Sequence, residues 1–195
     1  TYFNGSYSIS SGKFNLNTND NLSVSGQAAS LGITRSVNYP DFVKKLSFII
    51  GTNFFLYDFD DYLVNTKVGE TKYVDFDANY LSAEINGGLC YHFLDLPSIK
   101  LSLRSGIDLQ KILASRQNVR VETLVDNVVQ TNNAELEVYN GLVVYQTNQV
   151  VAVIPNFSER FQAGIAISYP LNESLSETNS LCINRSVSFS VILKL

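Results

Sequence analysis

Four charged side chains occur in segments where polar and apolar residues alternate, which makes them the first candidates for chemistry. They are Glu84, Arg104, Asp108 and Arg160. A period of two places polar and apolar residues on opposite faces of a strand, so all four are expected on polar faces. They could line a charged cavity that binds or gates a solute, or form ion pairs that fill a narrow interior. We favour the ion-pair network, because buried charges need partners to be tolerated.

His92 is the only histidine, and it follows Cys90 by two positions on the same face of its segment. A zinc site needs three or four ligands, and no further ligands are evident, so we predict no metal. A Ser–His–Asp site would require Ser and Asp to converge on His92. No GxSxG, P-loop, HExxH or dinucleotide motif is present. We therefore predict no catalytic residues and no cofactor; an enzyme would need a pocket that joins His92 to a Ser or Asp.

A third candidate is an acidic segment that could bind calcium through carboxylate oxygens. It lacks the spacing of an EF-hand loop, so we favour a solvated loop with aromatic residues at its base. The acidic residues are Asp58, Asp60, Asp61, Glu70, Asp75 and Asp77, and the aromatic residues are Phe54, Phe55, Tyr57, Phe59 and Tyr62.

Composition excludes several classes of protein. The chain has 195 residues, of which 45% are hydrophobic and 16% charged, and its net charge of −4 argues against binding to nucleic acid. No apolar stretch approaches the roughly 18 residues of a transmembrane helix. The chain begins without Met and without a charged and apolar leader, so we expect a mature chain after removal of a signal peptide. Cys90 and Cys182 could form one disulfide or remain free thiols; we favour free thiols.

The elements that must position these residues are strands. Residues 99–110 are the clearest case, because Leu101, Leu103, Ile107 and Leu109 alternate with polar residues. The same alternation predicts strands over 2–10, 22–36, 46–57, 81–93, 160–169, 173–183 and 186–195. A change of phase near Ala28 and Ala29 suggests a bulge. Apolar alternation within 114–157 predicts an extra hairpin in that region.

Connections of two lengths alternate along the chain. Those near 37–43, 93–99 and 169–173 are short, whereas 11–21, 58–79 and 114–157 are long and polar. The polar faces are rich in Gly, Ser, Asn and Gln, which suits a narrow barrel interior. Transmembrane β-barrels have short periplasmic turns and long extracellular loops. We therefore predict one domain over 1–195, an all-β, antiparallel up-and-down transmembrane β-barrel of about eight strands with long loops on one side.

The alternative is a soluble β-barrel or sandwich that binds a small apolar ligand in its interior. The direction of the apolar faces separates the two hypotheses. A soluble fold would turn these faces into a shared core, whereas a transmembrane barrel would turn them outward. The diagnostic residues are Leu101, Leu103, Ile165, Ile167, Phe189 and Val191.

The run of residues 80–93, a short turn and residues 99–106 together resemble the central hairpin of small outer-membrane β-barrel proteins of the Bacteroidetes type. The similarity extends to 161–169 and 186–195. The resemblance implies an eight-stranded barrel in the bacterial outer membrane, generally without enzymatic activity. Its partners would be outer-membrane lipid and an unknown extracellular ligand. We expect a structural, adhesive or ligand-binding role carried by the loops 58–79 and 114–157, because loops on rigid scaffolds carry function.

Overall fold

The computed structural model describes residues 1–15, 21–38, 45–67, 69–126, 128–134, 137–138, 141–155, 157–158, 160–171 and 180–195. These residues form β1 (Tyr2–Asn15), β2 (Asn21–Asn38), β3 (Leu46–Lys67), β4 (Glu70–Asp95), β5 (Lys100–Val125), β6 (Val128–Ala134), β7 (Glu137–Val138), β8 (Val143–Val153), β9 (Phe161–Pro170) and β10 (Ser180–Lys194). No helix in this part of the chain is long and apolar enough to cross a membrane.

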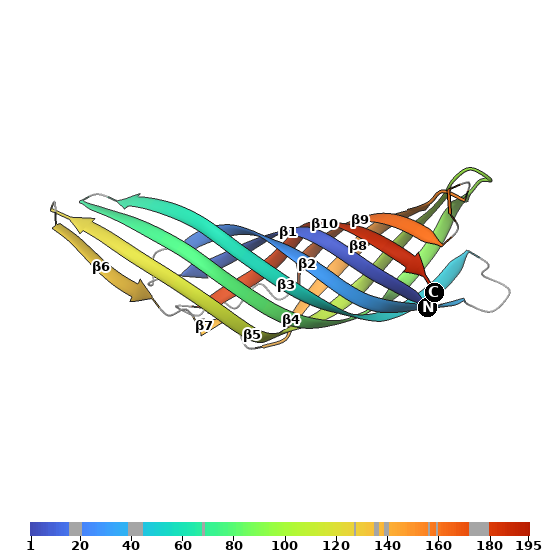
Figure 1. Cartoon of the computed structure of the whole chain (residues 1–195), viewed down its shortest axis with the longest axis horizontal. Coiled ribbons are helices and arrows are strands. Elements are labelled where there is room, and N and C mark those ends of the chain that lie inside the picture. The colour runs from blue at the N-terminus through green and yellow to red at the C-terminus, as the bar shows by residue number, and fades with distance from the viewer. Residues whose placement is uncertain are drawn as a thin grey trace.

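Eight of the described strands close into a ring. The order is β1-β2-β3-β4-β5-β8-β9-β10, each pair is antiparallel, and β10 pairs back with β1. The strands are tilted, and both termini lie at the same end of the barrel as the β4–β5 turn (Figure 1); we call this end the terminal rim. This architecture confirms the predicted antiparallel up-and-down barrel of about eight strands.

The directions of the side chains on the ring distinguish a transmembrane barrel from a soluble barrel or sandwich. Leu103, Ile165 and Val191 point outward and are 41%, 54% and 52% exposed, while Arg104 and Gln162 on the same strands point inward. On β4 the outward apolar residues run over 81–91, a length that suits a membrane-spanning strand. We call this outer belt the apolar band. The soluble alternative, which needs these side chains in a shared core, is wrong.

Residues 58–79 form strands rather than the predicted loop. β3 and β4 have 22 and 26 residues and stay paired from Leu46↔Tyr91 to Lys67↔Glu70. The acidic residues suggest a loop in the sequence, but Asp60, Asp75 and Asp77 are exposed along the outer face while their neighbours Phe59 and Phe76 are buried. The period of two therefore continues through the acidic segment.

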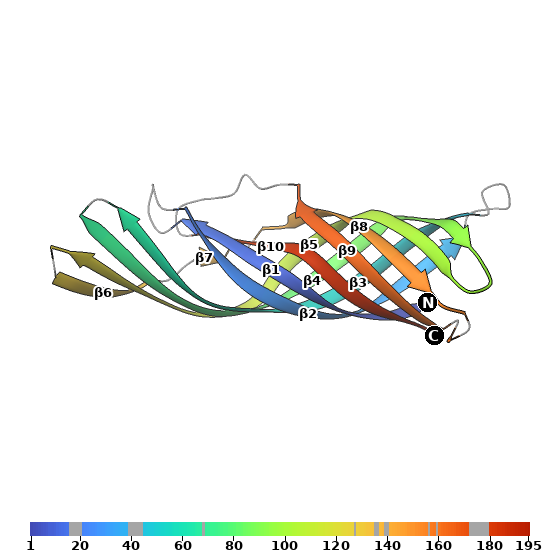
Figure 2. The ribbon, with the colours of Figure 1, turned by 90° about the horizontal axis from the view of Figure 1, so that it is seen from above.

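A wall of four strands projects beyond the ring at the end opposite the terminal rim (Figures 1 and 2). It consists of residues 60–67, 70–77 and 118–125, together with β6, which pairs with the end of β5. β2 pairs with β3 only as far as Phe59, so β3 has no described partner on that side within the wall. The long segment 114–157 thus supplies the end of β5, β6 and the ring strand β8.

The interior has two halves. Towards the wall, an apolar cluster fills it, including the fully buried Tyr57, Phe59, Phe76 and Tyr80; we call this cluster the aromatic plug. Towards the terminal rim, the inward residues are polar. This division explains why the predicted bulge at Ala28 is wrong: the register of β2 is continuous there on both sides, and the apolar residues change from the inner to the outer face.

The last predicted strands also need correction. Residues 180–183, which we assigned to a separate strand over 173–183, belong to β10, and 172–179 lie outside the described residues. The eighth ring strand is instead β8, within 114–157. Polar and apolar residues still alternate after residue 110, where we predicted the end of the strand. The sequence therefore did not show that β5 continues to Val125 or that β8 is a separate ring strand.

Candidate functional site

The polar half of the lumen encloses a cavity of about 110 Å³. Glu84 from β4 and Arg104 and Asp108 from β5 line it, because the even-numbered residues in these parts of the two strands point inward. Glu84 and Asp108 are 3% and 6% exposed. A volume of this size holds a few water molecules, since each occupies about 30 Å³ in the liquid.

Hydrogen bonds cross the lumen to the Glu84 carboxylate. The Asn4 amide Nδ2 donates to Asn53 Oδ1 at 2.9 Å, and Asn53 Nδ2 donates to Glu84 Oε1 at 2.8 Å. β1, β3 and β4 supply one residue each to this chain of hydrogen bonds. The neutral amides therefore solvate a carboxylate that would otherwise be costly to bury.

A second set of hydrogen bonds holds Arg104 and Asp108, the two charged residues of β5 that line the cavity. Thr147 Oγ1 donates to Asp108 Oδ2 at 2.5 Å and lies 2.8 Å from Ser168 Oγ. The Arg104 guanidinium donates through Nη2 to Gln162 Oε1 at 3.1 Å. β5, β8 and β9 are thus joined inside the ring as well as through their backbones.

The structure brings together three of the four predicted site residues. Glu84, Arg104 and Asp108 line one cavity, and an ion-pair network among them stays a prediction. Arg160 is misplaced in our prediction: it precedes the first residue of β9, is exposed, and does not line the cavity. Sequence reasoning missed Asn53 and Thr147, although the parity of their strands already placed them on the inner face.

The aromatic plug closes the lumen on the side of the wall. Phe59 packs edge-on against Phe76 and Tyr80, with ring centroids 6.3 and 5.9 Å apart. Tyr57 stacks on Phe55 and Phe59. Together these rings occupy the cross-section of a narrow barrel, so the described part of the chain offers solutes no wide passage.

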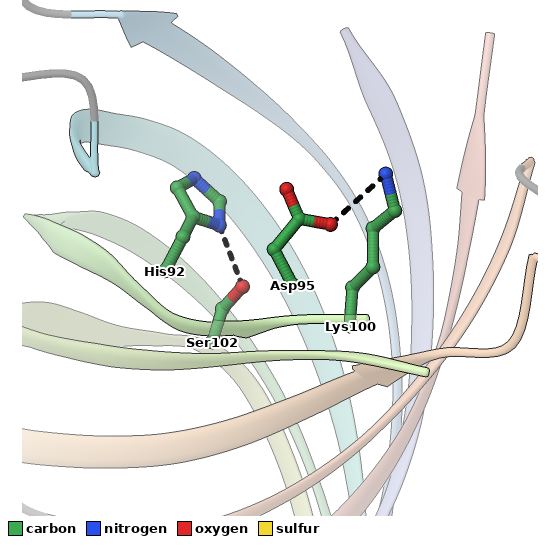
Figure 3. Close-up of polar contacts among 4 residues, drawn as sticks. All are labelled: His92, Asp95, Lys100 and Ser102. Carbon is green, nitrogen blue, oxygen red and sulfur yellow. Dashed lines mark hydrogen bonds and ion pairs between the residues drawn. The ribbon is translucent and has the colours of Figure 1, made fainter. Parts of the chain in front are cut away.

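His92 lies at the terminal rim, just past the apolar band. Its Nδ1 is 2.7 Å from Ser102 Oγ, and the nearby Asp95 carboxylate pairs with Lys100 at 3.3 Å (Figure 3). Partial burial lowers the pKa of His92, Arg104 lowers it further, and Asp95 opposes both. In Figure 3 the Asp95 carboxylate faces Lys100, so Ser102 and His92 meet without the acid that completes a Ser–His–Asp site.

The acidic residues of 58–77 and the cysteines are the remaining candidates for a site. Within the described residues, no group of three or more His, Cys, Asp or Glu side chains could hold a metal ion. Asp60 lies opposite Asp77 and Asp75 lies opposite Tyr62 along the wall, so the acidic side chains form an extended row. Cys90 is a buried free thiol, and the Cys182 side chain lies outside what the structure describes.

Comparisons with known proteins are consistent with this description of the fold. No protein-family model matches the chain, and no curated protein matches its sequence. The crystal structure of the outer membrane enzyme PagL superposes with a TM-score of 0.54 and 13% identity, covering 96% of this chain and 99% of PagL. Neisserial surface protein A gives a TM-score of 0.47 with 12% identity, over 100% and 96% of the two chains. Ail of Yersinia pestis gives 0.38 with 7% identity, over 98% and 96%.

The fold and the filled lumen define the class of the molecule: a small transmembrane β-barrel of the outer-membrane type, with eight ring strands in its described part. The likeness to PagL concerns this fold alone.

Proposed function

We propose that this chain is a bacterial outer-membrane protein whose wall binds a partner outside the cell, in an adhesive or ligand-binding role and without enzymatic activity. The finer assignment to the Bacteroidetes-type family is part of this proposal and rests on the alternating segments of the sequence. The terminal rim would face the periplasm, since short turns face that side in such barrels.

One observation carries the proposal. The wall extends β3, β4 and β5 well past the ring, and its far side is β6, which pairs with β5 and with no other described strand. Val128 and Val129 at the start of β6 are 59% and 60% exposed. An exposed strand edge with apolar side chains is a template for the addition of an extended segment from another chain.

The filled lumen favours binding over transport. Hydrogen-bonded side chains occupy its polar half and the aromatic plug occupies the rest. A barrel of eight strands has an interior just wide enough for its own side chains. This architecture therefore supports binding at the outer surface better than transport through the lumen.

Orientation is tested first, on intact bacteria that display the full chain. A maleimide reagent too large to cross the outer membrane should label Val129→Cys on intact cells, and should label Ser98→Cys, in the β4–β5 turn, only after permeabilisation. Unmodified chain measures the background from Cys90 and Cys182. Labelling of Ser98→Cys but not Val129→Cys on intact cells would reverse the proposed orientation.

Binding is tested with the same cells on surfaces coated with collagen, fibronectin or heparin. We expect retention on at least one coating, and its loss in Thr131→Pro. A proline in the middle of β6 either removes a donor from the free edge or breaks the pairing with β5. Retention that Thr131→Pro leaves unchanged, or equal retention of cells without the chain, would argue against binding through the edge of β6.

A further inference from the structure

Uncharged polar side chains from three neighbouring strands lie together at one place in the apolar band. These are Ser105 on β5, Gln146 and Asn148 on β8, and Tyr169 on β9; we call them the polar cluster. Ser105 lies opposite Asn148, and Gln146 lies opposite Tyr169. They share the outward face of their strands with apolar residues of the band, so the cluster forms one patch on the surface that lipid would cover.

The polar cluster lies within the apolar band. Along β5, Ser105 is flanked by Leu103 and Ile107, which are 41% and 43% exposed. Along β8, Asn148 is followed by Val150, which is 47% exposed. The hydrocarbon around these residues offers no hydrogen-bonding partner.

The cluster satisfies only part of its own hydrogen-bonding capacity. Ser105 Oγ donates to Asn148 Oδ1 at 2.7 Å, and Asn148 Nδ2 donates to the Tyr169 hydroxyl at 3.2 Å. The second Nδ2 hydrogen of Asn148 and the Tyr169 hydroxyl hydrogen remain available. The Gln146 amide takes part in neither of these two side-chain hydrogen bonds. A polar group exposed to lipid is costly unless another molecule supplies its partner.

The chemistry of the cluster fits a second copy of this chain. In a two-fold symmetric interface the same patch meets itself, so its groups must be self-complementary. Amides and hydroxyls both donate and accept, whereas a charged group at the axis would repel its mate. The cluster holds four such neutral groups and no charge. Small outward residues beside it, Gly87 opposite Ile107 and Ala152 opposite Ala163, leave room for a close approach between two barrels.

We propose that β5, β8 and β9 form the interface of a symmetric dimer within the membrane. The Gln146 and Asn148 amides of the two copies hydrogen-bond across the two-fold axis. The proposal concerns the lipid-facing side of the barrel and is independent of any ligand bound by the wall.

Dimerisation is measured on the full chain in phosphatidylcholine vesicles, by energy transfer between donor-labelled and acceptor-labelled copies over a series of lipid dilutions. We expect a reversible dimer in the unmodified chain. The double variant Gln146→Leu/Asn148→Leu should weaken dimerisation by about tenfold or more, since hydrogen bonds between membrane segments contribute modestly each. Thr52→Val, which removes an exposed outward hydroxyl from β3, is the matched control and should leave the dimer unchanged.

Cross-linking gives a second measurement that does not depend on the double variant folding. Under mild oxidation, Gln146→Cys should form a covalent dimer and Thr52→Cys should not, with the unmodified chain reporting any contribution from Cys90 and Cys182. A chain that stays monomeric at every lipid dilution would overturn the proposal. So would a double variant that dimerises as tightly as the unmodified chain, or equal cross-linking at both positions.

Discussion

The Gln110 amide joins the two halves of the barrel interior: its Nε2 donates to the Tyr57 hydroxyl oxygen at 2.6 Å and to Ser82 Oγ at 2.8 Å. Gln110 is 2% exposed and Tyr57 is fully buried. Both amide hydrogens are therefore used at the boundary between the polar lumen and the aromatic plug. The ring of Tyr57 packs within the aromatic plug, while its hydroxyl contacts Gln110 at the edge of the polar half.

Replacing Tyr57 by Phe should destabilise the barrel by about 1–3 kcal/mol, because one buried amide hydrogen of Gln110 loses its acceptor. The free energy of unfolding is measured in urea, with the protein refolded into vesicles. Tyr62→Phe is the matched control, since Tyr62 is 61% exposed on the wall, and it should behave like the unmodified chain. Equal stability of the two variants would show that the contact between Gln110 and Tyr57 contributes nothing measurable.

Stability should also depend on pH through His92. Its pKa is lowered in the folded chain, so below about pH 6.5 the unfolded state binds more protons than the folded state. The contribution of His92 is therefore fully present above that pH and is lost as the pH falls through the lower, folded value.

The measurement compares the unmodified chain with His92→Gln at about pH 8 and about pH 5. The variant should lose less stability on acidification than the unmodified chain. The comparison between the two chains removes the effects of the carboxylates that both share. A larger loss in the variant would mean that the folded chain favours protonated His92.

Which residues share a face of a strand followed from the sequence, because within an unbroken stretch this depends on residue parity. Leu103 and Arg104 are neighbours with opposite faces, and once Leu103 is known to point outward, Arg104, Asp108 and Gln110 all point inward. Parity does not say how far a strand continues. The wall was missed because Asp60 and Asp77 look like loop residues until the pairing of β3 with β4 places both on a wet outer face.

The candidate site was only partly predictable for a related reason. Glu84 and Asp108 could be placed on the inner face, but the cavity that they line also depends on Asn53 from β3 and Thr147 from β8. Those contacts depend on the register between strands far apart in the sequence. Arg160 has the parity of an inward residue, but β9 begins one residue later, and sequence patterns fix the ends of strands least well.

Ser102 should be unreactive towards a fluorophosphonate probe, although it contacts His92. Activation of serine requires a histidine that is itself oriented by a third group, and Asp95 is paired with Lys100 instead. The folded barrel is incubated with the probe and examined by intact mass. Covalent labelling that Ser102→Ala and His92→Gln both abolish would contradict the proposal that the chain is not an enzyme.

The position of the membrane can be tested with two residues that are equally exposed in the isolated chain. Ile165 in the apolar band is 54% exposed, and Val64 on the wall is 56% exposed. Ile165→Lys should cost about 2–4 kcal/mol if its side chain faces the bilayer midplane, whereas Val64→Lys should change stability little. Both are measured by urea unfolding in vesicles. Because exposure is matched, only the surrounding medium can separate the two variants, and equal effects would contradict the placement of the apolar band in lipid.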